Sequence, residues 1–500
     1  MNTPVIIVGA GPAGLMLAGE LRLAGTEVIV LERLAEPTGE SRGLGFTART
    51  MEVFDQRDML SRFGDIETSS YGHFGGLPID LGLQDGAHYA AKLVPQARTE
   101  AVIAEWATEL GADIRRGHEF VGLTDTGDGV DVDVKQPDGS VHTLRGSYLV
   151  GCDGGRSVVR KIGQFDFPGT AATREMFIAD VTGVDIRPRV IGETVPGGMA
   201  MGAQLPSGAH RIVVCERGNP PKKRTEAPGF DEVADAWQRL TGEDIHAGTG
   251  EWVTAFGDAT RQVTEYRKGR VILAGDAAHI HLPAGGQGMN ASIQDSVNLG
   301  WKLAAVVNGR APESLLDTYH SERHPVGARL LMNTQAQGLL FLSGDEVQPL
   351  RDVMTELIGF ESVSKHLGGM VTGLEIRYDV GPGDHPLLGM RMPSEDLATD
   401  TGKTSTTELL HGGRGVLLDL NNDAVLRHTA DAWADRVDTV TATPQSGPDG
   451  PLASTDAVLL RPDGHIAWLA PGSASGLVDS LNRWFGAAAT DRTPVGAGTR

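Results

Sequence analysis

The chain has 500 residues, of which 44 are Lys or Arg and 65 are Asp or Glu, so its net charge is −21. A field of this sign repels nucleic acid and anionic membrane surfaces, and neither is an expected partner. The length and the 40% hydrophobic content are typical of a globular protein with about three domains.

The N-terminus and the cysteines favour a cytoplasmic protein. The opening MNTPVIIVGAG has no basic region and its apolar stretch stops at a glycine, which is typical of a strand and not of a signal peptide. No apolar run reaches the roughly 18 residues that a membrane span needs. The only cysteines, Cys152 and Cys215, form no CxxC pair, which argues against a disulfide-reducing flavoenzyme.

The first motif is a glycine-rich turn inside a predicted βαβ unit. Residues 5–8 form a continuous apolar run typical of a buried strand, a helical repeat of apolar residues follows from Leu17, and residues 28–31 form a second strand. Between the first strand and the helix lies Gly9-Ala10-Gly11-Pro12-Ala13-Gly14, a GxGxxG pattern. In such a pattern the first glycine allows the turn, the second lets the backbone approach a pyrophosphate, and the third lets the helix pack on the strand.

The acid expected with this motif is also present. Glu32 follows the second strand, where its carboxylate can accept hydrogen bonds from ribose hydroxyls, and Arg33 follows it. A second match, Gly43 to Ala48, follows no strand and is interpreted as a chance match. The first match therefore predicts a dinucleotide site that uses the unpaired N–H groups at the start of the helix.

The second motif combines an acidic strand end with a helix N-terminus. Residues 271–274 form an apolar strand that leads into Gly275-Asp276, and the segment from Pro283 to Asn290 enters a helix. Ligands of open α/β sheets bind at the carboxyl ends of the strands, so Asp276 is a candidate acceptor for ribityl or ribose hydroxyls. The helix N-terminus suits the negative charge of a reduced flavin, which favours FAD over NAD.

A third motif, Cys152 to Ser157, follows a strand at residues 148–150, and Arg160 comes after it at helical spacing. A structural role for Asp153 and a position beside a pyridine nucleotide both stay open, with the structural role slightly favoured. The histidines give no clear catalytic base. We expect His279 and His281 to pack or form hydrogen bonds, and we expect His320 and His324 to lie on a solvated helix face, since they lack the HExxH pattern. No metal site is expected.

The fold class is predicted to be α/β, with a Rossmann-like FAD-binding domain, a β-sheet substrate domain and a C-terminal thioredoxin-like domain. Residues 293–342 have a helical pattern, and Gly381 to Pro386 mark a boundary. In the C-terminal part we expect strands at 415–420 and 457–460, with a hairpin turn at 461–465. The predicted domains are 1–73, 97–174 and 262–388 for FAD, 74–96 and 175–261 for the β-rich substrate domain, and 389–500 for the C-terminal domain.

Taken together, these motifs resemble those of the group A FAD-dependent aromatic hydroxylases, the para-hydroxybenzoate hydroxylase-like enzymes, along the whole chain. Segments 39–54, 73–80 and 281–290 are most similar to the angucycline polyketide hydroxylases. The resemblance implies non-covalent FAD, NADPH and O2 as co-substrates, and a flavin C4a-hydroperoxide that hydroxylates an aromatic polyketide. It also implies catalytic roles for Arg42 and Pro283. The cofactor-binding residues expected from the motifs and the resemblance are Gly9, Gly11, Pro12, Ala13, Gly14, Glu32, Arg33, Arg42, Gln96, Asp276, Pro283, Gly286, Gly288, Met289 and Asn290.

Three other functions are compatible with parts of the sequence. A flavin hydroxylase of tetracycline-like or rifamycin-like compounds would use the same FAD motifs. An NAD-dependent dehydrogenase would use the first motif alone and would leave the segment from Gly275 to Asn290 without a role. A partner protein could keep FAD as a structural group, although the presence of Arg42, Asp276 and Pro283 argues against it. The substrate-pocket residues and the oligomeric state are not determined by the sequence.

Overall fold

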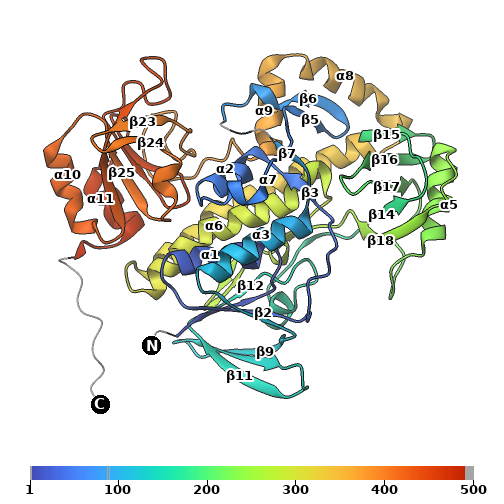
Figure 1. The fold of residues 1–500 in the computed structure, drawn as a ribbon, viewed down its shortest axis with the longest axis horizontal. Helices are drawn as coiled ribbons and strands as arrows, with labels where there is room; N and C mark the ends of the chain where they lie inside the picture. The colour runs from blue at the N-terminus through green and yellow to red at the C-terminus, as the bar shows by residue number, and fades with distance from the viewer. Residues whose placement is uncertain (1–2, 87, 89, 490–500) are drawn as a thin grey trace.

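A computed structural model describes residues 3–86, 88 and 90–489, and its centre is a mostly parallel six-stranded sheet (Figure 1). Only the edge strand β20 runs antiparallel to its neighbour. The strands, in spatial order, are β20 (Arg267–Lys268), β21 (Val271–Leu273), β12 (Tyr148–Gly151), β1 (Val5–Val8), β2 (Val28–Glu32) and β8 (Asp113–Arg116). The predicted βαβ unit is confirmed, because β1 and β2 pair in parallel on either side of the turn and helix α1 (Pro12–Leu23).

The central sheet is covered on both faces, which explains why its strands are continuous apolar runs. Helices α1, α3 (Gln96–Glu109) and α6 (Gln287–Val307) form one layer (Figure 1). On the other side lies an antiparallel sheet of β9 (Glu119–Asp125), β10 (Val130–Lys135) and β11 (Val141–Gly146). Val130, Val132 and Val134 of β10 share one hydrophobic core with β1.

The predicted β-rich middle region is an antiparallel five-stranded sheet. Its strands, in spatial order, are β15 (Arg189–Val195), β16 (Gly198–Gln204), β17 (His210–Glu216), β14 (Glu175–Thr182) and β18 (Thr249–Gly257). Helix α5 (Phe230–Thr241) packs on one face and buries Trp237 completely.

Segment 74–96 does not join this sheet, contrary to the sequence-based assignment of the two segments to one unit. In the described part of the segment, β5 (Tyr71–Phe74) pairs with β6 (Leu77–Asp80), and β7 (Ala90–Pro95) pairs with β3 (Leu44–Phe46) and β4 (Thr68–Ser69). The reason is packing: Phe74 and Ile79 bury their side chains against α7 (Asp317–Leu342) and α9 (Glu361–Thr372). The domain boundaries stay predictions.

The helical pattern of residues 293–342 is two helices, α6 and α7, separated by a break at Asn308–Leu316. Gly309 has a φ of 66° and Pro312 follows, so a single helix cannot continue through this stretch. The expectation of a solvated face for His320 and His324 is wrong. Both rings are half-buried against Tyr266: His320 Nδ1 accepts a hydrogen bond from the Tyr266 N–H, and His324 Nε2 lies 3.1 Å from the Val263 carbonyl oxygen.

The C-terminal domain has the predicted thioredoxin-like arrangement, a parallel pair joined to an antiparallel hairpin. Its main sheet has the order β26 (Val437–Thr441), β25 (Gly415–Asp419), β28 (Ala457–Leu460) and β29 (Ile466–Ala470), with helices α10 (Ala424–Ala430) and α11 (Leu477–Phe485). Residues 490–500, the end of the predicted domain, lie outside the described residues.

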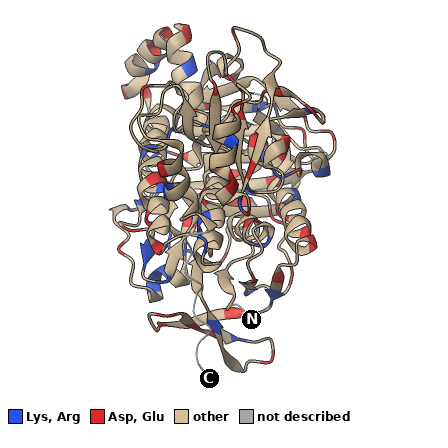
Figure 2. Ribbon diagram, turned by 90° about the vertical axis from the view of Figure 1, so that its left-hand side faces the viewer, with Lys and Arg blue, Asp and Glu red and all other residues tan. Residues whose placement is uncertain are grey.

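Short elements complete the fold. They are α2 (Ala48–Asp55), α4 (Val158–Ile162), α8 (Gln348–Ile358), β13 (Gly169–Thr170), β19 (Thr260–Gln262), β22 (His279–Ile280), β23 (Asp396–Thr399), β24 (Gly402–Ser405) and β27 (Thr443–Pro444). Acidic and basic residues are interspersed along the face in Figure 2. Among the described residues, no helix is both long enough and apolar enough to cross a membrane.

The hairpin turn predicted at residues 461–465 is confirmed, but it is buried against helices α6 and α7. Arg461 has no exposed surface and forms two hydrogen bonds of 2.6 and 2.9 Å to the carboxylate of Glu322 on α7. The same carboxylate accepts from Lys302 on α6 at 2.7 Å. Asp463 accepts from the indole N–H of Trp301 at 3.2 Å. A buried charge network thus joins the C-terminal domain to α6 and α7.

The backbone of this turn is also held by the FAD-binding domain. The Arg49 guanidinium donates to the Asp463 carbonyl oxygen at 2.8 Å, and the Arg57 guanidinium donates to the Pro462 carbonyl oxygen at 2.7 Å. Arg57 is in turn paired with buried Glu20 at 2.7 Å. Because every charge here has an opposite partner, the turn can be buried.

Breaking this network should destabilise the protein strongly. Replacing Glu322 by Gln leaves Arg461 and Lys302 buried with one countercharge fewer, which is expected to cost about 3–5 kcal/mol. The measurement is urea denaturation of the purified protein. Asp131→Asn, which weakens the exposed pair with Arg145, is the control and should cost less than about 1 kcal/mol. Equal effects of the two substitutions would contradict the structural role of the network.

The network also predicts a pH dependence. Burial alone would raise the pKa of Glu322, but the nearby Arg461 and Lys302 charges outweigh it and lower the pKa from its ordinary 4.5 to about 2. The stabilisation by this carboxylate is therefore complete above pH 4.5 and is lost as the pH falls toward 2. The stability difference between wild type and Glu322→Gln should shrink over this window. A difference that stays constant down to pH 2 would contradict the assignment.

Candidate functional site

Three loops meet at the carboxyl ends of the neighbouring strands β1, β12 and β21. They are the β1–α1 turn, the β12–α4 loop beginning at Cys152, and the β21–α6 loop beginning at Gly275. This edge is where open α/β sheets bind ligands. The parallel pairing of the three strands thus brings together motifs that are more than a hundred residues apart in the sequence.

The β1–α1 turn has the shape that a pyrophosphate site requires. Gly9 has a φ of 105°, and a Cβ there would lie 2.5 Å from the Cys152 carbonyl oxygen. A Cβ on Gly14 would lie 1.9 Å from the Gly9 carbonyl oxygen, whereas a Cβ on Gly11 would meet nothing within 4 Å. Gly9 and Gly14 are therefore required by packing, and Gly11 faces open space. Helix α1 starts at Pro12 without a side-chain cap, so its first N–H groups are available to an anion.

Glu32 connects the end of β2 to this turn. Its carboxylate accepts from the Ala10 N–H at 3.0 Å and from the Leu34 N–H at 2.9 Å. A carboxylate can accept about four hydrogen bonds, so two directions remain for ribose hydroxyls. Arg33, the next residue, is exposed.

The β21–α6 loop presents Asp276 to solvent at the same edge. A Cβ on Gly288 would lie 4.0 Å from the Asp276 carboxylate, so the start of α6 is directly beside this acid. Gly286 and Gly285 both have positive φ, 67° and 68°, and α6 begins at Gln287 without a side-chain cap. An exposed acid and open helix N–H groups form a site with both hydrogen-bond acceptors and donors.

Behind this loop lies a buried triad that the sequence did not reveal. Asp295 on α6 accepts from the Gly275 N–H at 3.1 Å, pairs with His279 Nε2 at 2.8 Å and accepts from Arg323 Nε at 2.6 Å. Burial would raise the pKa of Asp295, but Arg323 and His279 outweigh it and lower the pKa. The expected hydrogen-bonding role of His279 is confirmed, and the triad fixes the backbone next to Asp276. The only sign of this triad in the sequence is a polar residue, Asp295, within a long predicted helix. Such a residue more often lies on an exposed face.

The β12–α4 loop supports the structural interpretation of Asp153. Its carboxylate accepts from the N–H groups of Val158 and Val159 at 2.6 and 3.1 Å and so caps helix α4. Arg160 donates to the carbonyl oxygens of Gly155 and Ala277 and links this loop to the Asp276 loop.

Several residues that the sequence predicts to bind the cofactor lie close together at the start of α6. Gln96 Oε1 accepts from the Gly43 N–H at 3.3 Å, and a Cβ on Gly43 would lie within 3.9 Å of both Gln96 and the Met289 side chain. Asn290 Oδ1 accepts from the Thr47 N–H at 2.9 Å. Residues 43–47 and the N-terminus of α6 are therefore adjacent.

Arg42 and Pro283 are both exposed beside this site. Within the described residues, the two do not form a hydrogen bond with each other. The Arg42 loop is tied to the five-stranded sheet, because Arg211 of β17 donates to the Ser41 carbonyl oxygen and pairs with Asp180 at 2.6 Å. The neighbours of Pro283, Leu282 and Ala284, pack into an apolar cluster.

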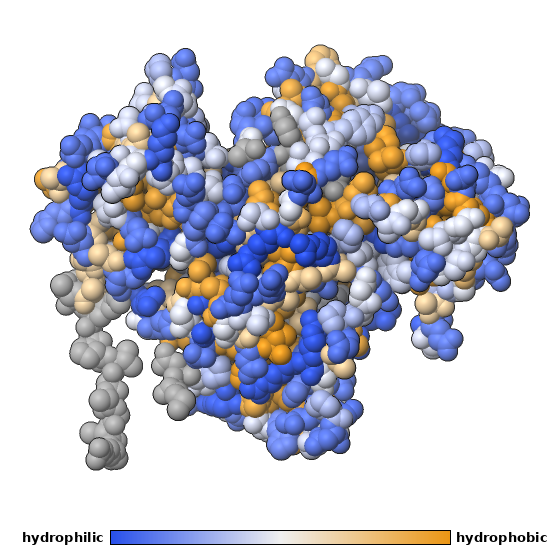
Figure 3. Space-filling view, viewed as in Figure 1, coloured by the Kyte–Doolittle hydropathy of each residue, from blue (hydrophilic) through white to orange (hydrophobic). Residues whose placement is uncertain are grey.

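We call this cluster the apolar wall. It joins the five-stranded sheet to the Pro283 loop and the end of α7, and it consists of Met176, Met199, Cys215, Leu282, Phe341 and Leu342, with Met201, Val213, Phe256 and Ala284 packed against it. Apolar residues also cover the junction of this sheet with the central domain in Figure 3. Burial raises the pKa of the Cys215 thiol to about 11, and it raises that of Cys152 as well, so both cysteines are unreactive thiols.

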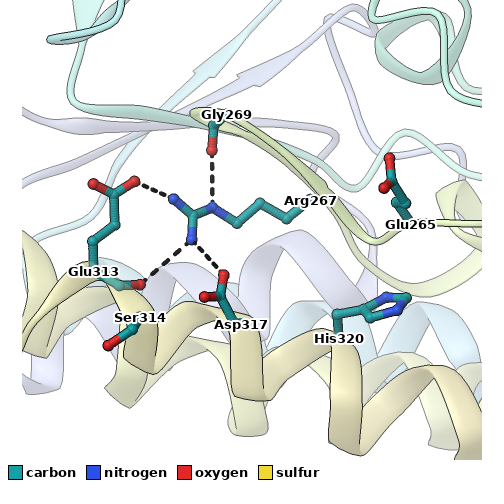
Figure 4. A pocket seen from close by; sticks show the side chains of 7 residues that line it. All are labelled: Glu265, Arg267, Gly269, Glu313, Ser314, Asp317 and His320. Atoms are coloured by element: carbon teal, nitrogen blue, oxygen red, sulfur yellow. Dashed lines mark hydrogen bonds and ion pairs between the residues drawn. The ribbon is translucent and has the colours of Figure 1, made fainter.

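Two other hollows differ in character from this site. A cavity of about 580 Å³ is lined by Arg267, Glu313 and Asp317, but Arg267 is paired with both acids and the hollow lies at the amino end of β21, away from Asp276 (Figure 4). A cavity of about 520 Å³ lies between α6, α7 and the end of α9, and Gln287, Gln294 and Asn333 line it. No group of His, Cys, Asp and Glu with metal-binding geometry occurs in the part of the chain that the structure describes.

Known proteins match the chain along its whole length. Residues 2–334 match the family of FAD binding domains, and residues 385–488 match the aromatic-ring hydroxylase C-terminal domain. The structure superimposes on CabE, an aromatic hydroxylase from angucycline biosynthesis, with a TM-score of 0.95 and 65% identity over 98% of this chain and 100% of that one.

Two curated relatives come from Streptomyces. A rifampicin monooxygenase of Streptomyces venezuelae is 45% identical over 97% of this chain and 99% of its own length. A 12-dehydrotetracycline 5-monooxygenase/anhydrotetracycline 6-monooxygenase of Streptomyces rimosus is 41% identical over 97% and 99%. The glycine turn, the exposed Asp276 and the uncapped α1 and α6 fit FAD, whereas a dehydrogenase using the first motif alone would leave the second and third loops without a role. The chain therefore belongs to the FAD-dependent aromatic-ring hydroxylases, a family of monooxygenases.

Proposed function

We propose that the enzyme is an NADPH-dependent monooxygenase that hydroxylates an angucyclinone, a polycyclic aromatic polyketide. The observation that carries this proposal is the apolar wall, which ends at the exposed Pro283 beside the N-terminus of α6. A flat polycyclic ring on this wall would lie next to the flavin end of the cofactor site. The 65% identity to an angucycline hydroxylase supports the substrate class.

The cofactor residues divide into three groups along the sheet edge. Gly9, Gly11 and Gly14, with Pro12 and Ala13 at the start of α1, would hold the pyrophosphate, and Glu32 and Arg33 would contact the adenosine end. Asp276 and Gln96 would bind the middle of FAD, and Arg42 would lie near the flavin. At the flavin ring, Pro283 would lie against the ring, and the segment of Gly286, Gly288, Met289 and Asn290 at the start of α6 would supply backbone N–H groups. FAD, when bound here, supplies the capacity to accept a hydride and to activate dioxygen.

The protein itself must exclude water and orient the ring. Met176, Met199 and Phe341 are buried within the apolar wall, and Met201, Val213 and Phe256 are its partly exposed members, which a ring could contact. Methionine side chains adapt to ring systems of different outline. Pro283 has no N–H group to donate and leaves this end of the pocket apolar. Arg211 holds the Arg42 loop against the substrate sheet, so binding of a substrate to the sheet and the position of Arg42 would be linked.

A second candidate substrate class consists of tetracycline-like or rifamycin-like compounds. It is supported by the relatives at 41% and 45% identity, which share the same FAD motifs. The higher identity to CabE favours the angucyclinone.

Replacing Asp276 by Ala should weaken FAD binding by about 10–100-fold, which corresponds to the loss of one or two hydrogen bonds to a charged group. The measurement is titration of the apoprotein with FAD, followed by flavin fluorescence. Asp317→Ala, which removes an exposed acid at the opposite end of the sheet, is the matched control and should bind FAD like wild type. Unchanged affinity in Asp276→Ala would remove this residue from the cofactor site.

The substrate class is tested by following NADPH oxidation by the FAD-loaded enzyme with an angucyclinone, anhydrotetracycline or rifampicin. We expect faster oxidation with the angucyclinone and a product heavier by one oxygen atom. Product from anhydrotetracycline or rifampicin alone would establish the second class instead. NADPH consumed only to hydrogen peroxide with all three compounds would reject both substrate classes and leave the FAD assignment intact.

A further inference from the structure

Three buried amide side chains form a hydrogen-bonded chain between the turn that joins β5 to β6 and the loop that carries Pro283. The Gly75 N–H donates to Gln337 Oε1 at 3.1 Å, and Gln337 Nε2 donates to Asn333 Oδ1 at 2.9 Å. Asn333 Nδ2 then donates to Gln287 Oε1 at 3.0 Å, and Gln287 Nε2 donates to the Ala284 carbonyl oxygen at 3.1 Å. The exposed fractions of the three amides are 0% for Gln337, 2% for Asn333 and 4% for Gln287.

The direction of this chain is fixed by its ends. A backbone N–H can only donate and a backbone carbonyl can only accept, so each amide between them must accept on one side and donate on the other. Every link therefore depends on its neighbours, and hydrogen bonds in such a buried series strengthen one another. Replacing any one amide by an apolar side chain leaves buried donors or acceptors without partners, which is costly.

The chain joins two loops that both adjoin the apolar wall, since a Cβ on Gly76 would lie 2.9 Å from the Phe341 ring and Ala284 packs against the wall. Gly75, with a φ of 59°, forms the turn between β5 and β6, and a Cβ there would lie 2.9 Å from Leu340 Cβ on α7. At the other end, Ala284 follows Pro283 and packs against the apolar wall. The chain thus links the β5–β6 turn, through α7 and the first turn of α6, to the loop that carries Pro283.

The same amides stand between the apolar wall and the cavity of about 520 Å³. Gln287 and Asn333 line that cavity, whereas Ala284 and Phe341 belong to or pack against the wall. The charged residues Arg329, Glu322 and Glu375 line this cavity together with apolar ones, and the cavity is open to solvent, so water can enter it. Side chains that are fully paired with one another offer water no free partner.

We propose that Gln287, Asn333 and Gln337 are positioning residues that hold the Pro283 loop and the β5–β6 turn at a fixed separation. In this position they also separate the apolar wall from the water of the neighbouring cavity. The positioning role concerns only the protein backbone of the two loops. Its consequence for hydroxylation rests on the proposed function. With the chain broken, water would reach the apolar wall, and reducing equivalents would be lost to hydrogen peroxide in place of product.

The positioning role is tested by hydrogen–deuterium exchange of the FAD-loaded protein, which needs no substrate. Asn333→Leu has a similar volume and touches neither loop backbone directly, yet it should speed exchange about tenfold in peptides containing Gly75 and Ala284, as expected for one lost buried hydrogen bond. Gln294→Leu is the matched control, because Gln294 is a buried amide on α6 that lines the same cavity outside the chain. It should leave both peptides unchanged. No change in either peptide for Asn333→Leu, or the same change in the control, would overturn the proposal.

A second variant separates hydrogen bonding from packing. A protonated Glu at position 337 can accept from Gly75 and donate to Asn333, whereas its carboxylate cannot donate. Exchange in the Gly75 and Ala284 peptides of Gln337→Glu, corrected for the intrinsic pH effect, should therefore resemble wild type at low pH and rise as the side chain ionises.

Wild type and Gln337→Met, measured over the same pH range, are the references. All three proteins contain the same ionisable groups near the hydrogen-bonded amides, namely His73, Glu322, Glu375, Arg329 and Arg351. Any pH dependence that these groups cause is therefore also seen in the references. Corrected exchange in Gln337→Glu that is independent of pH would contradict the hydrogen-bond chain. With an accepted substrate, the fraction of NADPH converted to product should follow the same pH curve, and failure of this readout alone would point to the proposed function and not to the chain.

Discussion

Helix α6 is buried along nearly its whole length although many of its side chains are polar, and this constraint organises the rest of the molecule. Buried polar groups must be paired, so each of them fixes a neighbour. Asn290 holds the Thr47 backbone, Asp295 holds Gly275, Ser296 donates to the Ala13 carbonyl oxygen at 2.8 Å, and Lys302 binds Glu322. One helix thereby sets the relative positions of the glycine turn, the Asp276 loop and the C-terminal domain.

The C-terminal domain is consequently part of the FAD-binding half and not an appended unit. Its 461–465 turn supplies Arg461 and Asp463 to α6 and α7, and its backbone carbonyls receive hydrogen bonds from Arg49 and Arg57. The Arg461 guanidinium also lies 4.5 Å from the Trp484 ring of α11. Since the same α6 begins at the candidate flavin site, damage to the turn and damage to cofactor binding are physically connected.

The candidate site is a junction between a polar edge and an apolar wall. Exposed Asp276 and the open N-termini of α1 and α6 suit a charged cofactor, whereas the methionine-rich wall suits an uncharged ring. Pro283 lies where the two meet, and the loop that carries it is held from behind by the amide of Gln287. A hydroxylase needs this combination, because one reactant is held by charge and hydrogen bonds and the other by exclusion of water.

The sequence by itself determined the FAD-binding unit, the β-rich middle, the C-terminal fold and the cofactor loops at the sheet edge. These depend on local patterns: apolar runs for buried strands, glycines where a Cβ would clash, and an acid at a strand end. Only the tertiary structure decided the partners of Asp295, the half-burial of His320 and His324, the placement of segment 74–96 against α7 and α9, and the burial of the 461–465 turn. Periodicity reports which face of an element is apolar, but the pairing of a polar side chain with a group a hundred residues away leaves no periodic signal. The burial of the polar side chains of α6 could therefore not be predicted from the sequence.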